Sequence, residues 1–184
     1  MNRRLPLSTF AVCSALLLTG CAKTVSKEDA EKFIEENYTS TEEKEMKIHS
    51  VSNVEKAEGI YEKLMKVGKE ENDTTAKVAP IKKAELSVYS ADYFEFKVQG
   101  KKLIIEYSLK GDELVDMLGS LIGDSVSKED FEIKGSASAK MIYDENGYPV
   151  SSSEKCDMNF KYSKSGFSVE GALKMTEEIT YSFK

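Results

Sequence analysis

The sequence predicts an α+β fold: a long, curved antiparallel sheet, shaped as a half-open β-barrel, with two or three helices on its concave face. Two observations predict it. From about residue 85 to the end of the chain, apolar side chains alternate with polar ones, as in strands with one buried face. Two other segments, one before this region and one within it, have apolar residues at helical spacing. Helices of this kind can cover the apolar face of such a sheet.

The first helix is expected over residues 27–38, after a tether at 22–25. Ser26 is a suitable N-cap, and acidic residues follow in the first turn, where the helix dipole favours them. The apolar residues with helical spacing are Ala30, Phe33, Ile34 and Tyr38. Residues 39–47 are polar and predict a loop.

The stretch from 48 to 80 has a less regular pattern. Val54, Ala57 and Tyr61 fit a helix over 53–67 that begins after an Asn53 cap, although Gly59 weakens it. Residues 68–77 are polar and are expected to be flexible.

The pattern then changes to a period of two. Strands are expected around residues 86–88, 94–98 and 103–109, with a turn at 99–101. An apolar helix follows over 112–122, capped by Asp112 and closed by Gly123.

The clearest strand runs from Phe131 to Tyr143, because every odd-numbered position there is apolar or small. Asn146-Gly147 predicts a hairpin turn, and Pro149 indicates an edge position or a late strand start. The chain returns through 156–162, turns at 164–166 and continues to residue 183. Glu177 interrupts the apolar face of this last strand, so a bulge or turn is expected near 176–178.

Composition excludes several classes of function. The 184 residues carry a net charge of −6. No arginine follows Arg4, which argues against a nucleic-acid partner. The only histidine, His49, is expected in a solvated position, and Cys156 is expected as a small buried side chain. No phosphate-binding or dinucleotide motif is present. We therefore expect no enzyme activity, no cofactor and no metal.

The N-terminus has the pattern of a lipoprotein precursor. Arg3 and Arg4 precede an uncharged run, Leu5 to Leu18, and then Leu18-Thr19-Gly20-Cys21. This resembles the lipobox of bacterial lipoproteins, which implies a signal peptide at 1–20, lipid attachment at Cys21 and a single domain at 26–184. The mature chain then has 24 basic against 32 acidic residues, a net charge of −8. Acyl chains hold such a protein at the membrane, outside the cytoplasm; an outer membrane is possible if the source is Gram-negative.

A second resemblance covers about half of the chain. The segments Phe94–Leu109, Gly111–Leu114 and the hairpin Ile142–Val150 make the region from Tyr93 to Lys184 similar to surface lipoproteins of Gram-positive bacteria. Those look like the LolA/LolB and LppX/LprG group. The resemblance implies a half-open β-barrel with helices on the concave side, and binding of lipids or of the acyl chains of lipoproteins. It implies no catalytic residues.

The sequence thus leads to two hypotheses. In the first, the half-barrel cavity binds a lipid or another hydrophobic ligand. The expected lining residues are Phe94, Phe96, Ile105, Tyr107, Ile133, Met141, Met158, Phe160 and Val169. In the second, the sheet is fully packed on its helices, as a LolA-like or NTF2-like scaffold, and the protein is a non-catalytic module that contacts an envelope or cell-wall partner. The small residues Gly135, Ala137 and Ala139 fit either a ligand or a closely packed helix.

Overall fold

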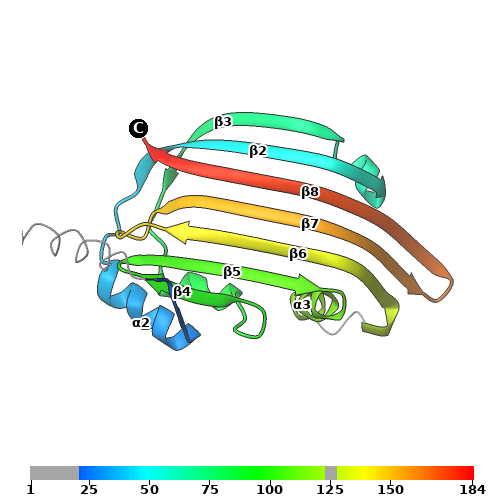
Figure 1. Cartoon of the computed structure of the whole chain (residues 1–184), viewed down its shortest axis with the longest axis horizontal. Coiled ribbons are helices and arrows are strands. Elements are labelled where there is room, and N and C mark those ends of the chain that lie inside the picture. Colours follow the sequence, from blue (N-terminus) through cyan, green and yellow to red (C-terminus); the bar gives the residue numbers. More distant parts are fainter. Residues whose placement is uncertain (1–20, 123–127) are drawn as a thin grey trace, which may run out of the picture.

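A computed structural model describes residues 21–122 and 128–184. The expected signal peptide and Gly123 lie outside these residues. The described chain forms one open, eight-stranded sheet with all neighbouring strands antiparallel, and it carries short helices (Figure 1). In chain order the elements are β1 (Lys23–Val25), α2 (Lys27–Asn37), β2 (Lys44–Gly59), the 3₁₀ helix η1 (Ile60–Lys63), β3 (Gly68–Val78), the 3₁₀ helix η2 (Lys83–Val88), β4 (Glu95–Gln99), β5 (Lys102–Lys110), α3 (Asp112–Ile122), the 3₁₀ helix η3 (Lys128–Asp130), β6 (Phe131–Tyr143), β7 (Pro149–Lys164) and β8 (Phe167–Phe183).

The strand order is β1-β4-β5-β6-β7-β8-β2-β3. β4 and β5 form a hairpin, and β6, β7 and β8 follow as a meander of long strands. β2 then lies on the free side of β8 and forms a hairpin with β3. The sheet does not close, so β1 and β3 are its two edges.

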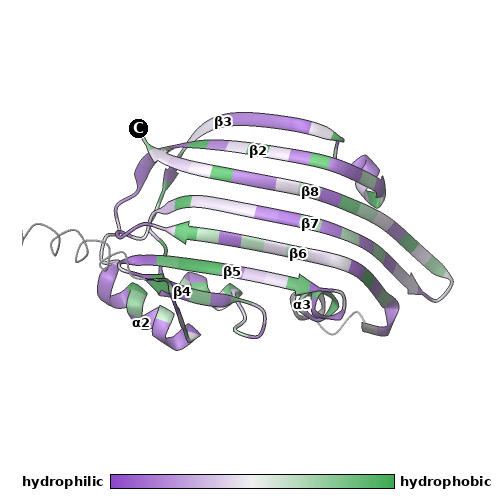
Figure 2. Ribbon diagram, viewed as in Figure 1, coloured by the Kyte–Doolittle hydropathy of each residue, from purple (hydrophilic) through white to green (hydrophobic). Residues whose placement is uncertain are grey.

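The alternation of apolar and polar side chains along the strands gives the sheet two different faces. We call inner the face that bears the odd-numbered residues of β5, β6 and β8 and the even-numbered residues of β4 and β7; the opposite face is the outer face. Register pairs place Ile133 opposite Phe160 and Ala137 opposite Cys156 on the inner face. Figure 2 shows the alternation as bands of opposite hydropathy along β6, β7 and β8, whereas β3 is largely hydrophilic.

Three separate clusters cover parts of the inner face. At one end, α2 and η2 bury the apolar side of β4 and β5, and Ala30 and Leu86 are fully buried there. At the other end, Leu114 and Val115 of α3 pack on Leu109 and on the start of β6. At the same end of the sheet as α3 but on the β2 side (Figure 1), the η1 segment folds over β7, β8 and β2, around Cys156. The middle of the inner face lies between these covers.

Most of the predicted elements are confirmed. The helices at 27–37 and 112–122, the strand at 131–143, the hairpin before Pro149 and the turn before Phe167 form where expected. Ser26 caps α2, because its hydroxyl oxygen accepts a hydrogen bond from the Asp29 amide at 3.1 Å.

The expectations for residues 39–80 are wrong. The loop ends early and the expected helix at 53–67 is absent, because β2 occupies 44–59; the expected flexible stretch is β3. A register shift between Val54 and Lys56 explains the error. The extra residue puts both Val54 and Ala57 on the inner face, and this spacing of three imitates a helix.

Three smaller expectations also differ from the structure. Residues 83–88 form η2 rather than a strand, because Leu86 is buried against α2. β8 runs without interruption through 176–178, so Glu177 remains on the inner face, opposite Glu154. Residues 23–25 pair with β4 as β1 and are not part of a free tether.

Candidate functional site

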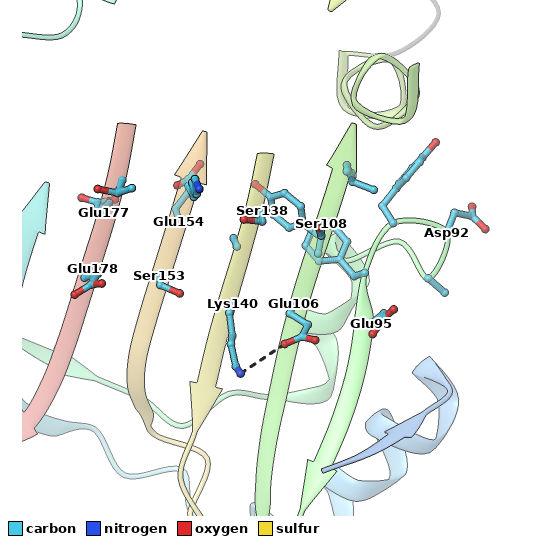
Figure 3. A pocket seen from close by; sticks show the side chains of 18 residues that line it. Asp92, Glu95, Glu106, Ser108, Ser138, Lys140, Ser153, Glu154, Glu177 and Glu178 are labelled. Carbon is cyan, nitrogen blue, oxygen red and sulfur yellow. Dashed lines mark ion pairs between the residues drawn. The ribbon is translucent and has the colours of Figure 1, made fainter. Parts of the chain in front are cut away.

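A cavity of about 740 Å³ lies in the middle of the inner face, between the α2–η2 cover and the α3 cover (Figure 3). Four neighbouring strands supply its floor in one continuous row. Tyr107 of β5 is opposite Ala139 of β6, which is opposite Glu154 of β7, which is opposite Glu177 of β8. The floor is therefore built by strand register, and the small side chain of Ala139 deepens it.

Aromatic side chains form one wall. The loop between η2 and β4 brings Tyr93 and Phe94 to the cavity. Phe94 packs edge-on against Tyr107, with ring centroids 5.2 Å apart, and against Tyr89, at 5.1 Å. Burial raises the pKa of Tyr107, and the nearby Glu154 carboxylate adds to this rise. Tyr107 therefore presents a neutral, largely apolar surface at neutral pH.

The opposite side of the floor is acidic. Glu154 and Glu177 face each other directly across β7 and β8, and among the described residues neither carboxylate has an ion-pair or hydrogen-bond partner. Partial burial raises the pKa of Glu154, and the charge of Glu177 contributes to the rise. The neighbouring Lys140 does not neutralise them, because it pairs with Glu106 at 3.7 Å on the outer face (Figure 3). Like charges directly opposite each other destabilise a sheet.

A second cavity, of about 350 Å³, lies further along the same strands. The segment that leads from β3 to η2 crosses the sheet here, and the Ile81 amide donates a hydrogen bond to the Gly147 carbonyl oxygen at 2.9 Å. The lining includes Ile81, Met141, Tyr143 and Tyr181. Burial is the main reason why the pKa of Tyr143 lies well above its usual value. This second cavity is less polar than the floor around Glu154.

The structure divides the nine expected lining residues among different environments. Phe94 and Tyr107 line the larger cavity and Met141 lines the smaller one. Phe96, Ile105 and Ile133 are almost completely buried beneath the helices, and Met158 and Phe160 pack beside α3. Val169 is partly buried on β8, opposite Tyr162. All nine lie on the inner face, but that face is partly packed core and partly open.

Several cavity residues were missed in the sequence. Tyr93, Glu154 and Glu177 were not expected as lining residues, and Ala139, which fitted either a ligand or a closely packed helix, lines the cavity. A signal for both glutamates was present, since each shares the parity of apolar neighbours: Glu154 with Cys156, and Glu177 with Met175 and Ile179. An acidic residue among the apolar positions of a strand indicates that this position is not part of the packed core.

The cysteine thiol at position 156 and the only histidine, in the described part of the chain, lie in surroundings that do not indicate catalysis. Cys156 is 4% exposed, and burial raises the pKa of its thiol to about 11, so it is not a nucleophile at neutral pH. His49 Nδ1 lies 2.9 Å from Asp73 Oδ1, across β2 and β3, and is partly exposed. No group of three potential metal-ligating His, Cys, Asp or Glu side chains occurs within residues 21–122 and 128–184. In the same ranges, no helix is long and apolar enough to cross a membrane.

Comparisons with protein-family models, with curated protein sequences and with solved structures find no match for this chain. The class of protein is therefore set by the fold itself: a mostly-β protein of the α+β class, with one open, eight-stranded antiparallel sheet and helices on its inner face. Within that class, this structure has a partly open inner face with a cavity between two helical covers.

Proposed function

We propose that this protein is a membrane-anchored, extracytoplasmic lipoprotein that binds a lipid or another hydrophobic ligand on its inner face. The observation that carries the proposal is the cavity between the two helical covers. Its volume, about 740 Å³, falls within the range of roughly 300–1,000 Å³ that is typical of ligand pockets. Tyr93, Phe94 and Tyr107 give the cavity an aromatic wall, as is typical of such sites, and the rest of its lining is mostly polar or charged.

The expected anchor would hold this cavity close to a bilayer. Only Cys21 and Ala22 precede β1 among the described residues. At roughly 3.3–3.6 Å per extended residue, two residues reach less than about 10 Å. A ligand would have a short path between membrane and inner face. The open sheet with helices on one face also agrees in outline with the half-barrel of LolA-like and LppX-like lipoproteins, which supports the same proposal.

Native mass spectrometry of the purified protein tests ligand binding. We expect adducts of lipid mass that survive purification, or uptake of an added fatty acid. Ala139→Trp fills the cavity floor and should abolish the adduct. Thr180→Trp places the same side chain on the outer face of β8, where Thr180 is exposed, and should leave the adduct unchanged. Equal binding by both variants, or no binding by the unmodified protein, would contradict the proposal.

The anchor needs its own test. In cells, Cys21→Ser should move the protein from the membrane fraction to the soluble fraction and remove the acyl mass from its N-terminal peptide. A membrane-bound Cys21→Ser protein would show that lipidation at Cys21 is not what holds it.

A second candidate function, an interaction module, is favoured by the free edge of the sheet. β3 is exposed at ten of its eleven positions, Gly68–Lys77, and nearby Leu64 and Val67 are 75% and 57% exposed. An extended partner segment could pair with this edge. Cross-linking in whole cells from a photoreactive residue at position 72 tests it: a specific cross-linked protein would support the module, and only random adducts would oppose it.

A further inference from the structure

The two cavities on the inner face adjoin each other along β6 and β7. The larger one ends at Lys140 and Ser153, and the smaller one begins at Met141 and Ser152. From Glu154 to Pro149 the strand advances five residues, or about 16 Å at roughly 3.3 Å each. The cavities therefore form one elongated site rather than two unrelated hollows.

The two ends of this site differ in polarity. The end at Ile81, Met141, Tyr143 and Tyr181 is mainly apolar and aromatic, and its lining also includes Glu85, Ser151 and Ser152. At the other end, the directly opposed carboxylates of Glu154 and Glu177 have no cationic partner among the described residues. The same cavity is lined by Phe94 and by Tyr107, which lies two strands away from Glu154. A carboxylate pair beside aromatic rings is suited to an organic cation, which carboxylates attract by charge and aromatic rings attract through their faces.

We propose that the ligand of this site is a single-chain amphiphile with a cationic, amine-type head group. The ammonium group lies between Glu154 and Glu177, and the hydrocarbon chain runs along β6 and β7 towards Tyr143 and Tyr181. This inference deepens the proposed function and rests on it. It also accounts for the two opposed acids, since a bound cation would remove the repulsion between their carboxylates, which otherwise destabilises the sheet. A metal ion fits less well, because these carboxylates belong to no group of three ligating side chains in the described chain.

Two probes with the same chain and opposite head groups test the proposal. Dodecylamine and dodecanoate are titrated at pH 7, below their micellar concentrations, into the purified protein, and dissociation constants are measured by calorimetry. Dodecylamine should bind at least about tenfold more tightly, the factor expected from one charge-assisted hydrogen bond.

Glutamine variants assign that preference to the two carboxylates. Glu154→Gln and Glu177→Gln should each reduce it several-fold, and the double variant should bring the two dissociation constants close together. Glu170→Gln is the matched control, because Glu170 is exposed on the outer face of the same strand as Glu177. Retained dodecanoate binding shows that each variant is folded.

The outcomes separate this inference from the proposed function. Equal or tighter binding of dodecanoate to the unmodified protein would overturn the cationic head group but leave hydrophobic binding intact. A preference for dodecylamine that survives in the double variant would show that the two carboxylates do not recognise the head group, and it would overturn the inference. Failure of both probes to bind would overturn the inference together with the proposed function.

Discussion

Ile105 and Ile179 lie in one row of inner-face side chains, yet only the first is covered by helices. The row runs from Ile105 through Met141 and Ser152 to Ile179. Ile105 is 1% exposed beneath the α2–η2 cover, whereas Ile179 is only partly buried. Truncating each to alanine removes the same three carbon atoms from opposite ends of one row.

The two truncations should have different energetic costs. At about 0.8 kcal/mol for each buried carbon, Ile105→Ala loses about 2.4 kcal/mol of transfer free energy. The space left behind is enclosed by α2 and η2 and adds a cavity penalty, so about 3–4 kcal/mol is expected in total. At Ile179 the side chain is partly solvated and water can enter the space, so we expect about 1 kcal/mol. The difference is about 2 kcal/mol or more.

Urea unfolding followed by circular dichroism measures both free energies of unfolding, provided that the slope with urea concentration stays the same. For a domain of this size the difference corresponds to roughly 4–8 °C in Tm. Equal losses for the two variants would refute the reasoning, because they would mean that the β8 side of the inner face is covered as well as the β5 side.

Three further predictions follow from particular residues. Gly135→Ala should cost about 3 kcal/mol or more in unfolding experiments, because φ is +115° and an added Cβ would overlap the carbonyl oxygen of Asp157; Gly166→Ala, with φ of +82° and open space around it, should cost only about 1 kcal/mol. The thiol of Cys156, with its pKa raised to about 11, should react with a thiol reagent at pH 8 only upon unfolding, and rapid reaction of the native protein would contradict its burial. Because the pKa of Glu154 is raised in the folded state, its contribution to stability is fully present below the unfolded value and is lost as the pH rises through the folded value. Glu154→Gln should therefore be more stable than the unmodified protein near pH 7 but not at pH 4, and an unchanged difference between these two pH values would argue against this origin.

The strands and helices that depend on local patterns could be predicted from the sequence. The strand from Phe131 to Tyr143 alternates at every position up to Met141, and α2 has both a cap and helical spacing, so local sequence and tertiary packing agree there. The failure at β2 has a specific cause: the shift after Val54 changes which residues face inwards, and a single sequence does not reveal such a shift. β3 is almost entirely polar and forms a strand only because β2 pairs with it along its length.

The inner face could be predicted, but not its division into core and cavity. Ile105 and Tyr107 have the same parity and similar surroundings in sequence, yet η2 and α2 bury the first, and the second lines the open part. That difference depends on where the segment from Val78 to Phe94 crosses the sheet. Tertiary structure sets this position, and no periodic pattern in the sequence indicates it. The pairing of Glu154 with Glu177 likewise depends on the register of β7 and β8.

Cysteine accessibility on β6 tests the partly open inner face most directly. In a Cys21→Ser background, Ala139→Cys places a thiol on the cavity floor, and Ala137→Cys places one on the same face beneath α3, where Ala137 is 8% exposed. The native protein should be labelled rapidly by a maleimide at position 139 and only slowly at position 137, and a bound ligand should slow the first reaction alone. Equally slow labelling at both positions would contradict the open cavity on which the proposed function depends.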